Sequence, residues 1–397
     1  MHPHKMVLSA WVTLLLSSAA RLPAADRLAL WDESQAIPNA VDLPVLRDVT
    51  FHVIKRYEFS RDGYRFLHGV ALAWHQGRLY ASFGHNRGGE NTDTEEARVC
   101  HSDDGGKTWS PITTIDAGDA PGVGISHGVF LSHQGRLWAF HGAYTGTMQD
   151  VHTRCYVLRE TDGTWEHRGA VIQGGFWPLG EPQRMANGNW IMAGISVGQD
   201  NPAAVAISRG DDFTKWDLVV LPLLPGLGRV WGESAVIVAG NHVTNIARYG
   251  QQSVALVAVS RDYGRMWTSS QPSNLPMATS KPCAGTLSTG QRFLICCTSA
   301  DGGGRRSPLT IALTEPGATL FSRVFVIRHA EFPGGTGESH PKAALAYPSA
   351  VEHEGKLYVA YSNNGGNVGR QGSGRELWNN NSAELAVIPV EVLCSAP

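Results

Sequence analysis

A short pattern, in which two apolar segments flank a turn glycine, occurs six times along the chain. The first two copies, residues 74–81 and 132–139, are nearly identical in sequence. Glycine permits the backbone angles of tight turns, so each copy predicts a β-hairpin. The turn glycines stand 50 to 65 residues apart, at positions 77, 135, 188, 240, 290 and 355. This period predicts an all-β fold, a six-bladed β-propeller of four-stranded antiparallel blades.

The remaining strands give weaker signals. Apolar segments at residues 204–208, 254–259 and 309–313 fit the third strands of three blades. Residues 49–57 and 383–392 lie near opposite ends of the chain, and both have the composition of strands. We expect them to complete one blade together, which would close the ring and remove its exposed edges.

The first residues are typical of an export signal. Lys5 provides a basic start, and residues 6–20 form an apolar run too short to span a bilayer comfortably. We therefore predict a signal peptide at residues 1–25, one propeller domain at residues 26–397, and a secreted or periplasmic protein. An uncleaved anchor is the alternative. We expect no membrane contact beyond this segment and a monomeric chain.

Composition excludes some other classes of protein. The 397 residues are 42% hydrophobic and 17% charged, which suits a folded chain with a large core. A formal charge of −2 provides no general field for nucleic acid, so we expect no nucleic-acid partner. The sequence has no phosphate-binding loop, no nucleophile elbow and no cluster with zinc spacing, so it predicts neither a cofactor nor a metal. The six cysteines leave free thiols and disulfides equally open.

A second motif narrows the fold. Residues 102–109 fit the Asp-box pattern S-x-D-x-G-x-T-W without a mismatch, and residues 260–267 repeat it with Met266 in place of threonine. Residues 208–216 form a degraded third copy. The serine and aspartate can bond the backbone of the turn, while the tryptophan packs between strands. With these boxes and the blade spacing, nearly the whole chain after the signal segment resembles the sialidase (neuraminidase) superfamily.

The turn glycines also locate a candidate site. The inner strand of each blade begins at the face that carries a propeller's pocket, so residues seven to nine positions before each glycine should converge on the axis. Those residues are His68, His127, Glu181, Glu233, Pro282 and Tyr347. The second strands bring Arg248 near them, with Arg87 and Asp93 just beyond. Core packing does not select such a ring of ionisable groups, so it predicts an active site.

The resemblance implies roles for residues at matching positions. Tyr347 matches the tyrosine nucleophile of the family, and Glu233 matches its glutamate. Arg248 and Arg306 match two arginines that bind the substrate carboxylate. Asp93 fits the acid/base aspartate, with Glu90 as the second choice. These matches imply an exo-acting glycoside hydrolase that removes a terminal acidic sugar, sialic acid or a related one, from an acidic glycan or glycoconjugate.

The chemistry explains such a set. A sugar acid carries its carboxylate beside the anomeric carbon and would repel a carboxylate nucleophile, whereas a neutral tyrosine avoids this repulsion. An ordinary tyrosine has a pKa of about 10, so Tyr347 needs a base such as Glu233. Arg248 and Arg306 can hold the carboxylate through paired N–H donors. Asp93 would protonate the leaving oxygen and then activate water.

One position departs from the family pattern. His68 stands where the family has a third arginine, and His127 repeats the pattern in the second blade. We expect His68 to take part in catalysis. The other expected substrate contacts are His127, Glu181, Arg87 and Arg375.

Two inward histidines also leave other functions open. One is a propeller lyase that acts on uronate-containing glycans, with histidine and tyrosine as base and acid. Another is a glycan-binding propeller without catalysis.

Overall fold

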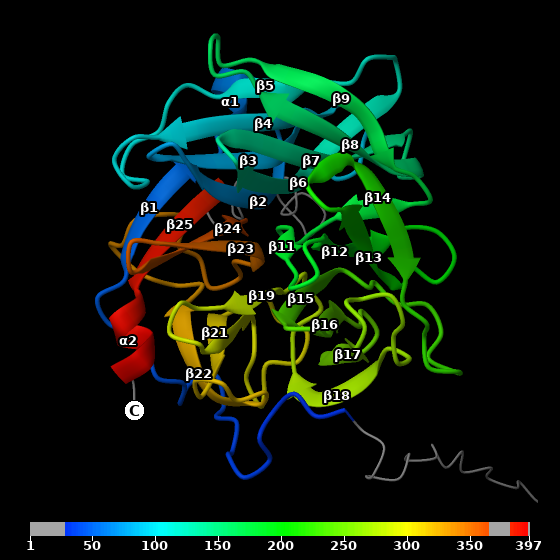
Figure 1. The fold of residues 1–397 in the computed structure, drawn as a ribbon. Coiled ribbons are helices and arrows are strands. Elements are labelled where there is room, and N and C mark those ends of the chain that lie inside the picture. Colours follow the sequence, from blue (N-terminus) through cyan, green and yellow to red (C-terminus); the bar gives the residue numbers. More distant parts are fainter. Residues whose placement is uncertain (1–27, 365–381, 396–397) are drawn as a thin grey trace, which may run out of the picture.

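Six antiparallel sheets surround a central axis in the computed structural model, which describes residues 28–364 and 382–395 (Figure 1). Their inner strands lie nearest the centre, and consecutive sheets follow one another around the ring. The prediction of an all-β, six-bladed propeller with four-stranded antiparallel blades is confirmed. Blade three differs in one detail, because its inner strand is broken into two short segments that both pair with the same second strand.

Every blade has an inner, a second, a third and an outer strand, and the blades are numbered one to six around the ring. The inner strands are β2 (Phe66–His75), β6 (Val123–His133), β10 (Phe176–Pro178) with β11 (Gln183–Arg184), β15 (Ser234–Ala239), β19 (Cys283–Thr286) and β23 (Leu345–His353). The second strands are β3 (Arg78–Asn86), β7 (Arg136–Thr145), β12 (Trp190–Ser196), β16 (His242–Arg248), β20 (Arg292–Cys296) and β24 (Lys356–Asn363). The third strands are β4 (Glu95–Ser102), β8 (Gln149–Leu158), β13 (Ala203–Arg209), β17 (Val254–Ser260), β21 (Leu309–Thr314) and β25 (Ser382–Pro389). The outer strands are β5 (Thr113–Asp116), β9 (Trp165–Ile172), β14 (Asp212–Val220), β18 (Gln271–Pro276), β22 (Phe321–Arg328) and β1 (Thr50–Lys55).

The repeated glycines form the turns between the inner and second strands, as predicted. All six have positive φ angles, between 65° and 86°. In blades one, two and six the residue before the glycine also has a positive φ, as two-residue turns of type I′ require. Those residues are Gln76, Gln134 and Glu354.

Blade six combines the first and the last strand of the described residues. β1 pairs with β25, and β25 pairs with β24, so the first strand of the propeller closes the ring (Figure 1). This confirms the predicted closure. The predicted strand at residues 383–392 was too long, because Pro389 has no N–H to continue the ladder. The chain turns there into the short helix α2 (Val390–Ser395). The other helix, α1 (Phe59–Asp62), precedes β2.

Adjacent blades bury their faces against each other. Six apolar clusters lie between neighbouring blades, one for each pair around the ring. The cluster between blades one and two, for example, joins Ala73 on β2 to Phe130 on β6 and Tyr156 on β8. Strand side chains point alternately to the two faces of a sheet, so each blade contributes to two clusters.

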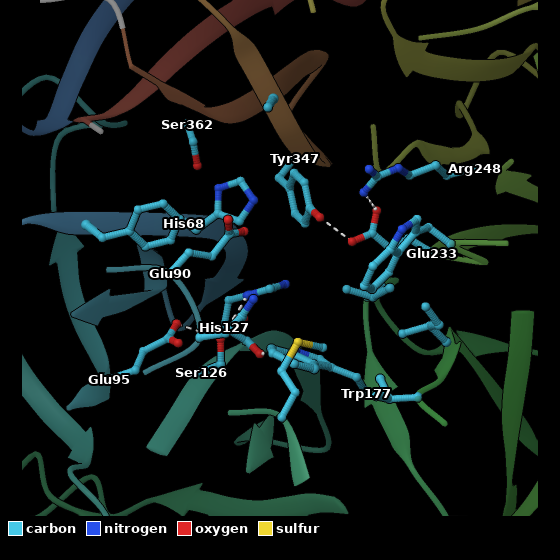
Figure 2. Close-up of a pocket in the computed structure, with 18 of the residues that line it drawn as sticks. His68, Glu90, Glu95, Ser126, His127, Trp177, Glu233, Arg248, Tyr347 and Ser362 are labelled. Atoms are coloured by element: carbon cyan, nitrogen blue, oxygen red, sulfur yellow. Dashed lines mark hydrogen bonds and ion pairs between the residues drawn. The ribbon is translucent and has the colours of Figure 1, made fainter. Parts of the chain in front are cut away.

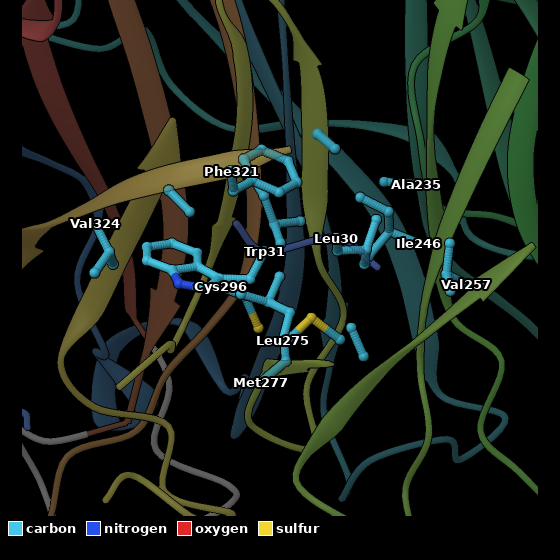
Figure 3. Close-up of a cluster of buried hydrophobic side chains, with 14 of the residues drawn as sticks. Leu30, Trp31, Ala235, Ile246, Val257, Leu275, Met277, Cys296, Phe321 and Val324 are labelled. Atoms are coloured by element: carbon cyan, nitrogen blue, oxygen red, sulfur yellow. The ribbon is translucent and has the colours of Figure 1, made fainter. Parts of the chain in front are cut away.

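The segment before β1 packs across blades four and five. Trp31 and Leu30 enter the cluster between these blades, beside Phe321 and Ile246 (Figure 3). The backbone N–H groups of Leu30 and Trp31 both donate to Asn274 Oδ1 at 2.9 Å, which fixes the segment to β18. The predicted signal peptide at residues 1–25 lies outside the described residues. Within the described residues, no helix is long and apolar enough to cross a membrane.

The Asp-boxes stabilise turns on the outer part of the blades. Ser102 Oγ donates to Asp104 at 2.8 Å and accepts the N–H of Gly106 at 2.8 Å. Asp104 also accepts the N–H of Thr108 at 2.9 Å. The second box repeats these bonds through Ser260 and Asp262. In all three boxes, including the degraded one, the tryptophan indole donates to the carbonyl three residues earlier.

Replacing Ser102 by alanine should lower the free energy of unfolding by about 1–3 kcal/mol, because the buried Gly106 N–H loses its acceptor. Chemical denaturation monitored by tryptophan fluorescence would measure this change. Ser34→Ala is the control, since Ser34 is exposed, and its effect should stay within about 0.5 kcal/mol. Equal effects of the two substitutions would contradict the role given to the box.

Candidate functional site

Three inner strands share the same irregularity at one end of the axis. The pairing of β2 with β3, of β6 with β7 and of β23 with β24 shifts by one residue at this end. In β2 the bulge directly follows His68. In β6 it consists of Ser126 and His127, and in β23 it includes Tyr347. Bulges redirect side chains and are frequent beside active sites. In this propeller they turn residues from three different blades toward one cavity of about 370 Å³.

Tyr347 and Glu233 form the centre of this cavity. The Tyr347 hydroxyl donates to Glu233 Oε1, and Arg248 donates to the other carboxylate oxygen at 2.8 Å (Figure 2). Glu233 directly precedes β15 and Arg248 ends β16, so the hairpin of blade four brings them together. Tyr347 is 5% exposed and has a φ of 55°, which is rare for an aromatic residue. Such strained backbone is concentrated at functional sites.

Two histidines pack beside the tyrosine. The rings of His68 and Tyr347 have centroids 3.7 Å apart, and the His127 ring lies 5.6 Å from Tyr347 and 5.8 Å from His68. Gly69 makes this possible, because a Cβ at its position would lie 2.1 Å from the His127 ring. The counting from turn glycines therefore located His68, His127, Glu233 and Tyr347 correctly in one cavity.

Arg306 and two tryptophans complete the walls. The Arg306 guanidinium lies 5.8 Å from the centre of the Tyr347 ring and donates to the carbonyl of Thr279 at 3.0 Å. Trp177 and Trp231 line other parts of the cavity. Arg248 and Arg306 thus approach Tyr347 from blades four and five, as a clamp for an anionic group requires.

Glu90 rather than Asp93 lines the cavity. Asn86 Oδ1 accepts hydrogen bonds from the Gly88 N–H at 2.8 Å and from the hydroxyls of Thr92 and Thr94 at 2.9 and 2.6 Å. These bonds fold the loop after β3 so that Glu90 lines the same cavity as Tyr347 (Figure 2). Glu90 and Asp93 are both exposed, but only Glu90 is among the residues that line the cavity, so the candidate for the acid/base role moves from Asp93 to Glu90.

Two other predicted contacts, Arg87 and Glu181, do not line this cavity. Arg87 packs on the Tyr64 ring at 4.3 Å and pairs with Glu96 at 3.2 Å, which draws it away from the axis. Glu181 lies in the break between β10 and β11 and faces a second cavity of about 520 Å³, nearer the hairpin turns. Arg375 lies outside the described residues.

The sequence interpretation missed a buried carboxylate in the cavity wall. Glu95 accepts hydrogen bonds from Ser126 Oγ and Tyr144 Oη, both at 2.6 Å, and Ser126 Oγ lies 3.1 Å from His127 Nδ1. Since the Ser126 hydroxyl donates to Glu95, its oxygen is left to accept from His127, which places the proton of the neutral ring on Nδ1. The position of Glu95 at the start of β4 gave no signal, because only inner and second strands were counted.

Burial controls the ionisation of these groups. Burial, and secondarily the charge of Glu233, holds the pKa of Tyr347 well above its usual value. Burial also lowers the pKa of His127 to about 3 and that of His68 well below its usual value, so both histidines are neutral. Glu90 is exposed as a residue, but desolvation of its carboxyl raises its pKa. Burial raises the pKa of Glu95 to about 7.

This arrangement suits proton transfer and anion binding. The Tyr347 hydroxyl is bonded to a carboxylate, two arginines line the same cavity, and so does Glu90, a carboxyl with a raised pKa. Among the described residues, no group of three or more His, Cys, Asp or Glu is placed to hold a metal ion. The six cysteines, which all lie in the described segments, form no disulfide there.

Comparisons with known proteins agree with the architecture. The family model of the BNR repeat-like domain matches residues 77–359. A search of curated protein sequences finds no match.

Several solved structures have the same fold. A protein of unknown function from Dyadobacter fermentans aligns with 17% identity and a TM-score of 0.63, over 87% of this chain and 99% of that one. The Hadza microbial sialidase Hz136 aligns with 13% identity and a TM-score of 0.64, over 86% and 68%. The leech intramolecular trans-sialidase aligns with 9% identity and a TM-score of 0.64, over 84% and 69%. At these identities the likeness shows the fold alone.

Glu181 provides a stability test of the second cavity. Burial raises the pKa of its carboxyl from 4.5 to about 8. Because the folded chain disfavours the ionised form, this carboxyl costs no stability below pH 4.5 and an increasing amount up to about pH 8. Glu181→Gln should therefore raise the melting temperature clearly at pH 9 and little at pH 4.5.

The matched control is Glu354→Gln. Glu354 is exposed, and glutamine already occupies the equivalent turn position in blades one and two. Thermal unfolding at several pH values should show no pH-dependent gain for this variant. A gain of the same size for both variants, or none for Glu181→Gln at pH 9, would argue against a buried, unpaired carboxyl.

Proposed function

The chain belongs to the BNR repeat-like domain family, and from this membership and the geometry around Tyr347 we propose that it is an exo-acting glycoside hydrolase. Its substrate is a glycan that ends in an acidic sugar, sialic acid or a related one. The fold is sialidase-like, and the comparison structures include sialidases and a trans-sialidase complexed with 2,7-anhydro-Neu5Ac. The observation that carries the proposal is the hydrogen bond from Tyr347 to a carboxylate that Arg248 also binds.

In the first step the sugar acid binds with its carboxylate between Arg248 and Arg306. Tyr347 Oη attacks the anomeric carbon, and its proton passes to Glu233 Oε1, to which the hydroxyl is already bonded. Glu90 gives its proton to the leaving glycosidic oxygen. The bond to the leaving group breaks as the bond to Tyr347 forms, which leaves a glycosyl-tyrosine intermediate.

In the second step water hydrolyses this intermediate. Glu90, now ionised, takes a proton from the water as its oxygen attacks the anomeric carbon. The bond to Tyr347 breaks, and Glu233 returns its proton to the phenolate oxygen. Two displacements at the same carbon retain the anomeric configuration. The raised pKa of Glu90 supports this role, since the carboxyl must carry a proton when the substrate binds.

Neutral His68 shapes the substrate preference. The ring packs against Tyr347 and stands where the resemblance to sialidases places a further arginine. A neutral imidazole can donate or accept one hydrogen bond at each nitrogen but contributes no charge to the clamp. The carboxylate is therefore bound through two guanidinium groups, and His68 contacts a neutral group of the sugar.

One observation favours a second candidate, a lyase. His68 and His127 are neutral and lie beside Tyr347, and a neutral imidazole can remove the proton next to a uronate carboxylate. Product masses from a panel of sialylated and uronate-containing glycans distinguish the reactions. Addition of water marks the proposed hydrolase, an unsaturated sugar marks the lyase, and unchanged glycan marks a binding protein.

Export and oligomeric state stay predictions. Sequencing of the mature N-terminus would test cleavage near residue 25, and light scattering would test the monomer. The substrate proposal depends on neither.

Tyr347→Phe should lower kcat/KM by about three orders of magnitude, because the phenylalanine cannot form the glycosyl intermediate. The control is Tyr361→Phe, which removes another buried tyrosine bonded to a glutamate, at 3.0 Å from Glu384, outside the cavity. This control should keep wild-type rates. Steady-state kinetics decide the matter, and an active Tyr347→Phe enzyme would remove the tyrosine from the mechanism.

Glu90→Gln should slow release of natural leaving groups by about 100-fold or more and slow release of a nitrophenol far less, because nitrophenolate leaves without protonation. Asp93→Asn is the matched control and should retain activity on both substrates, since Asp93 is exposed outside the cavity. The reverse result, with only Asp93→Asn impaired, would restore the assignment made from sequence.

A further inference from the structure

A buried lysine of blade five has no part in the proposed mechanism. Lys281 lies two residues before β19 and is 4% exposed. Its ammonium donates to the carbonyl of Pro348 at 2.7 Å. A charged side chain is costly to bury, so its retention in a core position calls for an explanation.

The lysine binds the peptide that follows Tyr347. Tyr347 and Pro348 form the bulge of β23, where the ladder with β24 is interrupted. Tyr347 adopts the left-handed conformation there, with a φ of 55°, and Pro348 has no N–H to contribute to the ladder. Strained backbone persists only where the surroundings hold it. The bond from Lys281 to Pro348 is such a restraint, and it comes from the neighbouring blade.

The charge of Lys281 also acts on the site. After burial, it is the largest influence lowering the pKa of His127, and it contributes to lowering the pKa of His68. Burial lowers the pKa of Lys281 itself, while Cys283 and Glu233 favour its charged form. The ammonium therefore lies close enough to the reacting groups to influence them without touching the cavity, whose lining does not include it.

We propose that Lys281 is a positioning residue: by holding the Pro348 carbonyl it fixes the bulge that presents the Tyr347 hydroxyl to Glu233. The inference rests on the proposed function for its kinetic consequence, but its structural content is independent of the substrate. Lys281 acts through Tyr347 and contacts neither sugar nor leaving group.

The second cavity makes a direct test possible. Lys281 lines this space of about 520 Å³, together with Glu181 and Cys283. Lys281→Ala removes three carbons and the ammonium, and 1-propylammonium replaces those atoms. A neutral molecule of the same length, 1-propanol, fills the space without the charge.

Lys281→Ala should lower kcat by about 100-fold, because a displaced nucleophile no longer faces Glu233, while KM changes less than about threefold. Added 1-propylammonium should restore at least a tenth of the lost rate, and 1-propanol at equal concentration should not. Equal recovery with both compounds, or an unchanged kcat, would overturn the proposal. If Lys281→Ala does not fold, Lys281→Met retains the volume and should show the same loss of kcat.

Lys55→Ala controls for the loss of a buried lysine. Lys55 is 9% exposed and its ammonium also donates to a backbone carbonyl, that of Arg56, but it lies outside the site cavity. Its substitution should lower thermal stability and leave kcat and KM at wild-type values. If Lys55→Ala lost as much kcat as Lys281→Ala, the effect of Lys281→Ala would be one of general destabilisation and not of positioning.

A crystal structure of Lys281→Ala separates this inference from the proposed function. Tyr347 should leave the left-handed region and its hydroxyl should move from Glu233, whether or not the wild-type protein cleaves any glycan. An unchanged bulge would refute the positioning role even in an active enzyme. A displaced bulge in a protein that cleaves no acidic glycan would leave the positioning role intact and disprove the hydrolase.

Discussion

Apolar packing between adjacent blades holds every other part of this molecule in place. A single blade cannot cover both of its faces, so each contributes to two clusters, and the ring of clusters fixes where the inner strands end. The site depends on this arrangement directly. Tyr347 comes from blade six, Glu233 from blade four, and His68 and His127 from blades one and two. No pair of neighbouring strands could supply this set alone.

Burial gives the site its chemical character. The same exclusion of water that keeps Tyr347 protonated at rest also keeps both histidines neutral. Positive charge in the described cavity wall is consequently confined to Arg248 and Arg306, and Glu233 already neutralises part of it. A bound substrate carboxylate would compete with Glu233 for the arginines. Glu233 would then interact less strongly with them and become a better acceptor for the tyrosine proton.

The sequence predicted the repeating parts well and the irregular parts poorly. Glycine turns have a fixed chemistry, so the hairpins, the blade number and four cavity residues could be located by counting. Counting assumes continuous strands, and Glu181, which lies in the break of the inner strand of blade three, lines the second cavity instead of the first. In blade five, counting pointed to Pro282 and so missed Lys281 beside it. Loop residues depend on hydrogen bonds such as those to Asn86, which have no period, and so Glu90 was ranked below Asp93.

The closing pair β1 and β25 has a consequence for how the protein is made. A ribosome produces β1 early and β25 more than 300 residues later, so for most of synthesis the first strand has no partner in its own sheet. An unpaired strand edge is a template for association with other chains. The nascent chain therefore has an aggregation-prone edge until β25 emerges, and the emergence of β25 decides whether the ring forms.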